Sequence, residues 1–226
     1  MEPVWDAELG IWKNSNVPWS SAAQQIPRPL WLFGYGSICW KPSFPFIEKC
    51  DGFINGYIRR FWQQSTDHRG TPQSPGLVMT LISKSDTGSM KYQSFITDDN
   101  VQGVAYRIPD DRIEEVVKDL DFREKGGYSR MVTDITLKRG NGMENGLETV
   151  SGLVYVARTD NPHFKYQPME QCAEIISKSI GPSGKNTDYL YQLDQYFVSH
   201  GIDDQYIRTL TRMVRSHDML NLQAKL

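Results

Sequence analysis

The sequence has few cysteines, and none of them forms a motif for a disulfide framework or a zinc ion. Three cysteines occur at long spacings, Cys39, Cys50 and Cys172, without a CxxC pair. The four histidines are scattered as well, and none has the HxxxH or HxH spacing that presents two ligands to a metal. We therefore expect no metal site and no structural disulfides, a cysteine usage typical of a reducing compartment.

Excess charge of one sign and long apolar runs are also missing. The formal net charge is −2, so no overall basic field favours nucleic acid or an anionic membrane. No apolar run approaches the roughly 18 residues that a membrane helix needs. The first residues are polar and acidic, whereas a secretory signal begins with basic residues and continues as an apolar stretch. These features predict a cytoplasmic protein that binds neither nucleic acid nor a membrane.

The remaining composition is that of an ordinary globular protein, with 39% hydrophobic and 23% charged residues. The length of 226 residues suits one domain with short appendages. Prolines and an SSAAQQ run break any periodicity over residues 1–27. We predict that this segment is a partly ordered N-terminal extension, although its three tryptophans could instead anchor it on the domain. The domain itself is predicted over residues 28–222.

Strand patterns come first along the chain and helical patterns last. The predicted strands span residues 31–35, 52–65, 77–82, 101–108, 128–138 and 147–157, and residues 52–65 form either a strand pair or one long bent strand. Residues 83–100 are polar and suggest a hairpin or a variable loop. One helix is predicted between the strands, from Pro109 to the Gly126–Gly127 pair, because apolar residues recur at helical spacing from Ile113 onward. This order predicts an α+β fold.

The chain from Met169 onward is predicted to be helical, and its first apolar stripe comprises Ala173, Ile176 and Ile180. Residues 181–187 (GPSGKNT) resemble a phosphate-binding loop, but the lysine is followed by asparagine where that motif has serine or threonine. We therefore interpret this segment as a turn between helices, with Asn186 or Thr187 as the cap.

The first candidate site is the segment Phe33–Ser37 (FGYGS), directly after the first predicted strand. Two glycines and a serine allow backbone N–H groups to approach a ligand closely, and such a nest binds a carboxylate or a developing oxyanion. The motif alone favours the alternative, a tight turn with glycines for steric reasons. A dinucleotide-binding motif is excluded because no third glycine follows at the required spacing.

The second candidate is Glu124. On a helix projected at 100° per residue, Glu124 falls within about 40° of Ile113, whereas the other acids of the segment, Asp121 included, lie about 80° or more away. Glu124 is thus predicted to be the one acid along the apolar stripe. Desolvation raises the pKa of such a carboxylate toward a value useful for a general base. Alternatively, the helix frays at Asp121 and Glu124 only pairs with Arg123, Lys125 or Arg130.

The third candidate is the polar loop of residues 65–72 (STDHRGTP). Arg69 could grip a substrate carboxylate in bidentate fashion, and Asp67 with His68 could relay a proton. A serine hydrolase that uses Ser37 or Ser65 is conceivable, but no GxSxG motif exists. A turn initiated by the aspartate explains the loop more simply.

Taken together, these segments resemble the ChaC family of glutathione-specific γ-glutamylcyclotransferases. The matching stretches are FGYGSICWKP (33–42), RRFWQQSTDHRGTP (59–72), GVAYRIP (103–109), LDFREKGGY (120–128) and GPSGKNTDYL (181–190). The resemblance spans about residues 30 to 200. It implies a γ-glutamylcyclotransferase-like mixed β-barrel with helices packed around it, in an α+β fold.

The resemblance also implies the reaction and its residues. Glu124 matches the catalytic glutamate, and the expected products from glutathione are 5-oxoproline and Cys-Gly. Cofactors and metals are not expected, and we predict a monomer. The predicted substrate-binding residues are Leu32, Phe33, Gly34, Tyr35, Gly36 and Ser37 from the family's substrate-binding loop, with Arg69 added from the polar loop.

The sequence departs from the family pattern in places, which leaves alternatives open. Leu77 stands where many members have arginine, and residues 129–131 replace an RTT-like run. The substrate could therefore be another γ-glutamyl amine. A binding or regulatory protein that retains the fold is a further alternative, although the intact loop and Glu124 argue against it.

Overall fold

The computed structural model describes residues 4–6, 11–13, 25–84, 100–124, 127–140, 146–157, 159 and 161–223, with side chains from residue 25 to residue 219 within these ranges. The chain forms two compact units. One comprises Met1–Arg59 and Leu81–Pro162, and the other comprises Arg60–Thr80 and His163–Leu226. Strands β5 (Tyr57–Ser65) and β6 (Gly76–Ser83) pair with each other and pass from one unit into the other.

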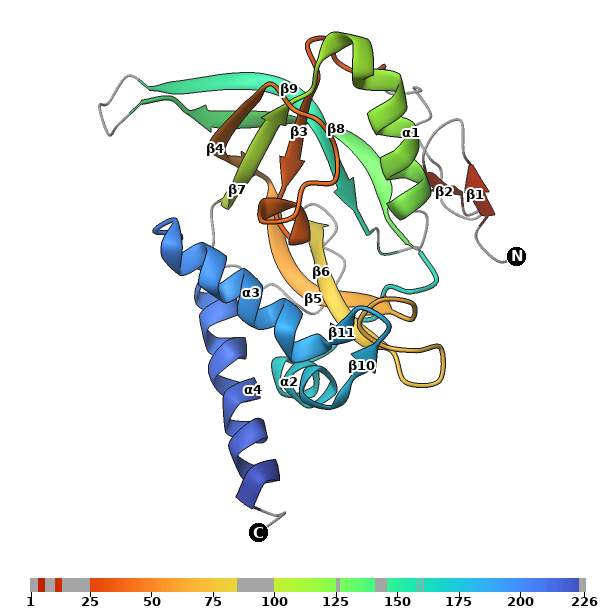
Figure 1. Cartoon of the computed structure of the whole chain (residues 1–226), viewed down its shortest axis with the longest axis vertical. Coiled ribbons are helices and arrows are strands. Elements are labelled where there is room, and N and C mark those ends of the chain that lie inside the picture. The colour runs from red at the N-terminus through yellow and green to blue at the C-terminus, as the bar shows by residue number, and fades with distance from the viewer. Residues whose placement is uncertain are drawn as a thin grey trace. The chain divides into compact units, whose positions relative to one another are not determined.

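A closed barrel forms the first unit (Figure 1), with strand order β3-β7-β4-β8-β9. Strand β3 is antiparallel to β7 and parallel to β9, and all other neighbours are antiparallel. This mixed barrel confirms the predicted fold class. Its strands are β3 (Trp31–Gly34), β4 (Glu48–Asn55), β7 (Asn100–Arg107), β8 (Ser129–Lys138) and β9 (Leu147–Val156).

The predicted strands of this unit are confirmed, and the stretch predicted over 52–65 is divided into β4 and β5. The division falls at Gly56, whose φ of 81° is a left-handed conformation that glycine adopts without strain. Of the loop predicted over 83–100, residues 85–99 lie outside the described residues. In the predicted N-terminal extension, β1 (Val4–Asp6) and β2 (Ile11–Lys13) pair antiparallel; the tryptophan side chains there are likewise outside the described set.

Strand β3 is closely packed within the barrel, and all four of its residues are buried. A Cβ atom on Gly103 of β7 would lie 2.2 Å from the carbonyl oxygen of Gly34, and one on Gly152 of β9 would lie 2.6 Å from that of Trp31. Both neighbours of β3 therefore need glycine where they approach it. This packing fixes the position at which β3 ends and the candidate loop begins.

Helix α1 (Ile113–Glu124) follows a short 3-10 turn, η4 (Asp110–Arg112), and packs against β8 (Figure 1). The apolar stripe predicted from Ile113 onward is buried, which confirms the helical spacing. Because α1 continues to Glu124, the helix does not fray at Asp121.

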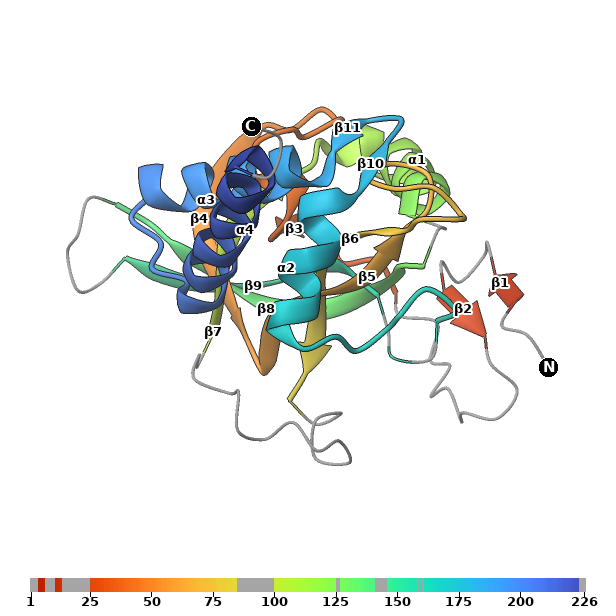
Figure 2. The same ribbon diagram turned by 90° about the horizontal axis from the view of Figure 1, so that it is seen from below.

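Three helices and a small hairpin form most of the second unit. Figure 2 shows α2 (Met169–Lys178), α3 (Asn186–Ser199) and α4 (Gln205–Gln223) side by side, with α4 against both others. The helices are amphipathic, and their apolar faces meet in a shared core. Its buried residues include Ala173, Ile176, Leu190, Leu193, Phe197, Ile207, Leu210 and Val214. Among the described residues, no helix is both long and apolar enough to cross a membrane.

The segment between α2 and α3 corrects two predictions. Ile180 was predicted on the first helical stripe, but α2 ends at Lys178 and Ile180 is 60% exposed. It belongs to a hairpin of β10 (Ile180–Gly181) and β11 (Gly184–Lys185), and Gly184, directly after the two-residue turn, has a φ of 101°. The predicted turn between helices is thus a short strand pair.

Neither Asn186 nor Thr187 caps α3, contrary to the prediction. The cap residue is Lys185, and no side-chain hydrogen bond caps the helix. The buried Asn186 side chain instead pairs with the backbone of Leu77 on β6: Oδ1 accepts from its N–H at 2.7 Å, and Nδ2 donates to its carbonyl at 2.8 Å. This long-range pair satisfies two backbone groups, and local sequence contains no signal for it.

The Asn186→Ala variant is expected to lower the free energy of unfolding by about 2–3 kcal/mol, because two buried backbone groups of Leu77 lose their partner. Urea unfolding followed by circular dichroism measures the change. Gln195→Ala on the exposed face of the same helix is the matched control and should change stability by less than about 0.5 kcal/mol. Equal stability of both variants would mean that the paired amide contributes nothing.

Candidate active site

The chain turns sharply directly after β3. Gly34 ends the strand, and Ser37–Cys39 forms the 3-10 helix η1. A Cβ atom on Gly34 would lie 2.7 Å from Cγ2 of Ile38, so a side chain at this position would clash with Ile38 of η1. The Cys39 thiol donates to the carbonyl of Gly34 at 3.3 Å, and the Cys39 N–H donates to that of Gly36 at 2.9 Å. The segment is therefore a tight turn held by its own backbone.

The carbonyl groups of this turn are held from the barrel side, whereas several of its N–H groups are not. Buried Arg59 donates to the carbonyl of Tyr35 at 3.5 Å, and the Tyr106 hydroxyl donates to that of Ile38 at 2.9 Å. Within the described ranges, no protein acceptor is recorded for the backbone N–H groups of Gly36, Ser37 or Ile38. The first amides of a helical turn lack internal partners. These amides can therefore serve a bound anion, as a nest does.

The other predicted loop residues have different environments. Leu32 and Phe33 lie within β3 with their side chains fully buried in the barrel. Tyr35 is buried too, and its hydroxyl donates to the carbonyl of Tyr155 on β9 at 2.6 Å. These side chains support the turn, and contact with a substrate stays a prediction for all of them.

A buried polar network holds the last turn of α1 against the barrel. The Tyr155 hydroxyl donates to Oδ1 of Asp121 at 2.7 Å, and Arg130 of β8 donates to Oδ2 of the same carboxylate. Burial raises the pKa of Asp121 above its ordinary value, and the contacts with Tyr155 and Arg130 act in the opposite direction. Burial also raises the pKa of Tyr155, and the charges of Asp121 and Glu124 add to that rise.

Asp121 therefore corrects the prediction that Glu124 is the one inward-facing acid of the helix. Asp121 is 7% exposed. On the helical projection, Asp121 lies at the edge of the apolar stripe. In the structure, Arg130 on β8 and Tyr155 on β9 contact it there, and a projection of the helix alone cannot show such contacts. Sequence reasoning missed Asp121 and Tyr155 and named Arg130 only as an alternative partner of Glu124, because strand pairing and the packing of α1 on β8 bring the three residues together.

Glu124 lies at the end of α1, and its side chain is 16% exposed. Its Oε1 atom is 3.1 Å from Nε of Arg123. The same guanidinium donates from Nη2 to the Ser37 hydroxyl at 3.3 Å and from Nη1 to the Ser43 hydroxyl at 2.9 Å. Arg123 thus links Glu124 directly to the turn after β3. The sequence analysis predicted a pair between Arg123 and Glu124 only for the case in which the helix frays. In the structure the pair forms although α1 continues to Glu124.

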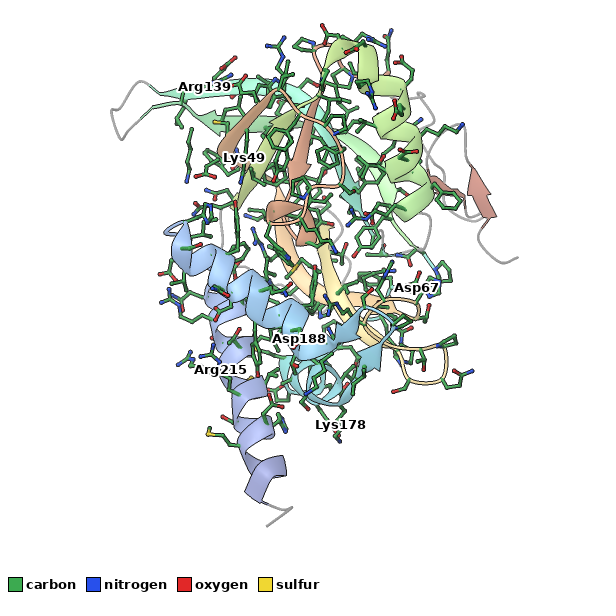
Figure 3. The ribbon with its side chains drawn as sticks, viewed as in Figure 1. Lys49, Asp67, Arg139, Lys178, Asp188 and Arg215 are labelled. Carbon is green, nitrogen blue, oxygen red and sulfur yellow. The ribbon has the colours of Figure 1, made fainter. Side chains whose placement is uncertain are left out.

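Arg69 belongs to the second unit. Its backbone N–H donates to the Ser65 hydroxyl at 3.0 Å, and its guanidinium donates to the carbonyl of Lys185 at 3.0 Å. Figure 3 labels Asp67 in this loop and Asp188 at the start of α3. A role of Arg69 in substrate binding stays a prediction.

The predicted relay and the serine alternatives also have definite neighbours. Nε2 of His68 is 3.8 Å from the Asp67 carboxylate, beyond hydrogen-bond distance, and Nδ1 lies 3.2 Å from the Ser183 hydroxyl. Neither Ser37 nor Ser65 has a histidine partner in the part of the chain that the structure describes. That arrangement does not support a serine nucleophile. In the same part of the chain, no group of three or more His, Cys, Asp and Glu side chains could hold a metal ion.

Comparison with known proteins agrees with this architecture. A family described as ChaC-like protein matches residues 30–217. The glutathione-specific gamma-glutamylcyclotransferase of Schizosaccharomyces pombe is 40% identical over 166 residues, covering 73% of this chain and 80% of the relative. Gamma-glutamylcyclotransferase 2-3 of Arabidopsis thaliana is 36% identical over 191 residues, covering 82% and 88%.

A solved structure matches as well. The crystal structure of the yeast gamma-glutamylcyclotransferase specific to glutathione superposes with a TM-score of 0.74 at 31% identity. The match covers 83% of this chain and 96% of that one, so the predicted γ-glutamylcyclotransferase-like fold is confirmed. With a family match over most of its length and relatives of this similarity, the chain belongs to the ChaC-like family.

Proposed function

We propose that this chain is a γ-glutamylcyclotransferase that cleaves glutathione to 5-oxoproline and Cys-Gly, with Glu124 as the general acid and base. The names of its relatives support the reaction and the substrate. The observation that supports the role of Glu124 is its connection through Arg123 to Ser37. This connection brings a largely buried carboxylate close to the turn in which the N–H groups of Gly36, Ser37 and Ile38 have no protein acceptor among the described residues.

The reaction uses the amine of the substrate as its own nucleophile. The α-amine of a γ-glutamyl group is mostly protonated at neutral pH, and Glu124 accepts that proton. The freed amine attacks the γ-carbonyl carbon and closes a five-membered lactam. Because both groups belong to one molecule, holding the folded-back conformer supplies a large proximity effect.

The turn after β3 stabilises the charge that develops during this attack. The carbonyl oxygen becomes an oxyanion, and the N–H groups of Gly36 and Ser37 are donors for it. The amide bond to cysteine then breaks, and Glu124 returns the proton to the departing amine of Cys-Gly. One carbon–nitrogen bond forms, one breaks, and no water is consumed.

Purified protein incubated with glutathione and, separately, with γ-glutamyl-alanine tests this proposal. Mass spectrometry should detect 5-oxoproline and Cys-Gly from glutathione, at a kcat/KM clearly above that for γ-glutamyl-alanine. Preference for γ-glutamyl-alanine would identify another γ-glutamyl amine as the substrate. Absence of 5-oxoproline from every γ-glutamyl compound would favour a binding protein and would refute the proposed activity.

We expect the chain to act as a monomer in the cytoplasm, where reduced glutathione is available. Size-exclusion chromatography with light scattering tests the first expectation, and imaging of the tagged chain tests the second. A stable dimer or an exported chain would contradict them.

A further inference from the structure

Arg123 is the residue that joins the two parts of the candidate site. It precedes Glu124 at the end of α1, and its side chain is 35% exposed. Its guanidinium contacts the Glu124 carboxylate and the hydroxyls of Ser37 and Ser43, at 3.1, 3.3 and 2.9 Å. One planar group thus connects the helix that carries the proposed base with η1 and with the loop that follows η1.

The charge of Arg123 favours the ionised form of Glu124. Among the groups near Glu124, Arg123 on α1 supplies a positive charge in direct contact. Tyr155 on β9 interacts with Glu124 electrostatically, and Arg130 on β8 forms an ion pair with Asp121. An adjacent cation lowers the proton affinity of a carboxylate. Glu124 therefore has a nearby source of charge stabilisation before a substrate amine arrives.

The shape of Arg123 matters as well as its charge. A guanidinium presents several N–H groups in one rigid plane, so the two hydroxyls and the carboxylate are held at fixed relative positions. A lysine in its place carries the same charge on a flexible stem and cannot reproduce that fork. Charge and shape can thus be separated by substitution.

We propose that Arg123 is a positioning residue: it sets the placement of Glu124 relative to the turn at Ser37 and keeps Glu124 ionised in the free enzyme. The inference rests on the proposed cyclotransferase reaction and names the residue that makes its base competent at neutral pH. Arg123 itself does not contact the reacting atoms.

Three variants separate the two effects. Arg123→Gln removes charge and fork, and should lower kcat about 10- to 100-fold and move the acid limb of the kcat/KM–pH profile up by about one pH unit. Arg123→Lys keeps the charge, so kcat should fall while the acid limb stays within about 0.3 pH unit of wild type.

Ser43→Ala removes one partner only and should lower kcat about 2- to 5-fold. Arg112→Gln, an exposed arginine paired with Glu115, is the control and should match wild type.

A readout independent of activity distinguishes failure of this inference from failure of the proposed function. Titration of the ¹³C-labelled Glu124 carboxyl by NMR should show its midpoint about one pH unit higher in Arg123→Gln, but not in Arg123→Lys. An unchanged midpoint in Arg123→Gln, or wild-type kcat in both Arg123 variants, would overturn the inference.

A wild-type protein that releases no 5-oxoproline would refute the activity, while the titration still decides whether Arg123 controls the charge of Glu124. If Arg123→Gln does not fold, Arg123→Lys and Ser43→Ala decide the positioning role through kcat.

Discussion

The Glu124→Gln variant is expected to cleave glutathione about 10³-fold more slowly than the wild-type protein, because glutamine keeps the shape of glutamate but cannot accept the proton of the substrate amine. The fold should be retained, since glutamine has the size and shape of glutamate and Glu124 is the last residue of α1. Release of 5-oxoproline under single-turnover conditions measures the loss. The loss should fall on kcat more than on KM.

Two controls make this result specific. Glu115→Gln changes an exposed acid on the same helix and should leave the rate unchanged. Isothermal titration should show that Glu124→Gln still binds glutathione, with a dissociation constant within several-fold of that of the wild-type protein. A Glu124→Gln rate within tenfold of wild type would remove Glu124 from the role of base.

The second large effect is expected from Asp121. Asp121→Leu should lower the free energy of unfolding by about 2–4 kcal/mol, because it leaves the largely buried Arg130 without its carboxylate and removes the 2.7 Å acceptor of the Tyr155 hydroxyl, whose other acceptor, the Val117 carbonyl, lies at 3.5 Å. Asp121→Asn retains an acceptor for Tyr155 and should cost less. Activity should fall in both variants, because the network orients the last turn of α1, which carries Glu124.

The pH dependence of this loss has a definite sign. Burial raises the pKa of Asp121, so the folded chain binds this proton more tightly than the unfolded chain. The contribution of the group to stability is therefore largest at acidic pH and decreases as the pH rises through the folded-state pKa. Urea unfolding at about pH 4 and about pH 7 should show the larger gap between wild type and Asp121→Leu at the lower pH.

Asp119→Asn is the matched control for Asp121→Asn, because Asp119 is an exposed acid of the same helix. It should change stability by less than about 0.5 kcal/mol at both pH values. If Asp121→Leu were as stable as wild type, the buried contacts with Arg130 and Tyr155 would contribute nothing to holding α1 in place.

The sequence was sufficient to predict the elements that depend on local periodicity. The strands of the barrel follow from runs of apolar residues, and α1 follows from apolar spacing that begins at Ile113 and continues to Glu124. Ile180 shows the limit of this reasoning. Its spacing continues the apolar pattern of α2, but the helix ends at Lys178. The hairpin that follows α2 depends on the left-handed turn at Gly184.

The partners of polar side chains could not be predicted in the same way. Asn186 pairs with Leu77, and Asp121 is bound by Arg130 and Tyr155. Each of these contacts depends on strand pairing or on packing between segments that are distant in the sequence. The turn at Ser37 was identified from its glycines and from the family resemblance. The connection of this turn to Glu124 through Arg123 could not be predicted, because it depends on the packing of the end of α1 beside the turn.

Reaction of glutathione in water enriched in ¹⁸O tests the intramolecular cyclisation most directly. Attack by the amine of the substrate consumes no water, so wild-type protein should release 5-oxoproline without ¹⁸O, and Glu124→Gln should release very little of it. Glutamate carrying ¹⁸O in its γ-carboxylate would instead show that water attacks the γ-carbonyl, and that result would contradict the mechanism.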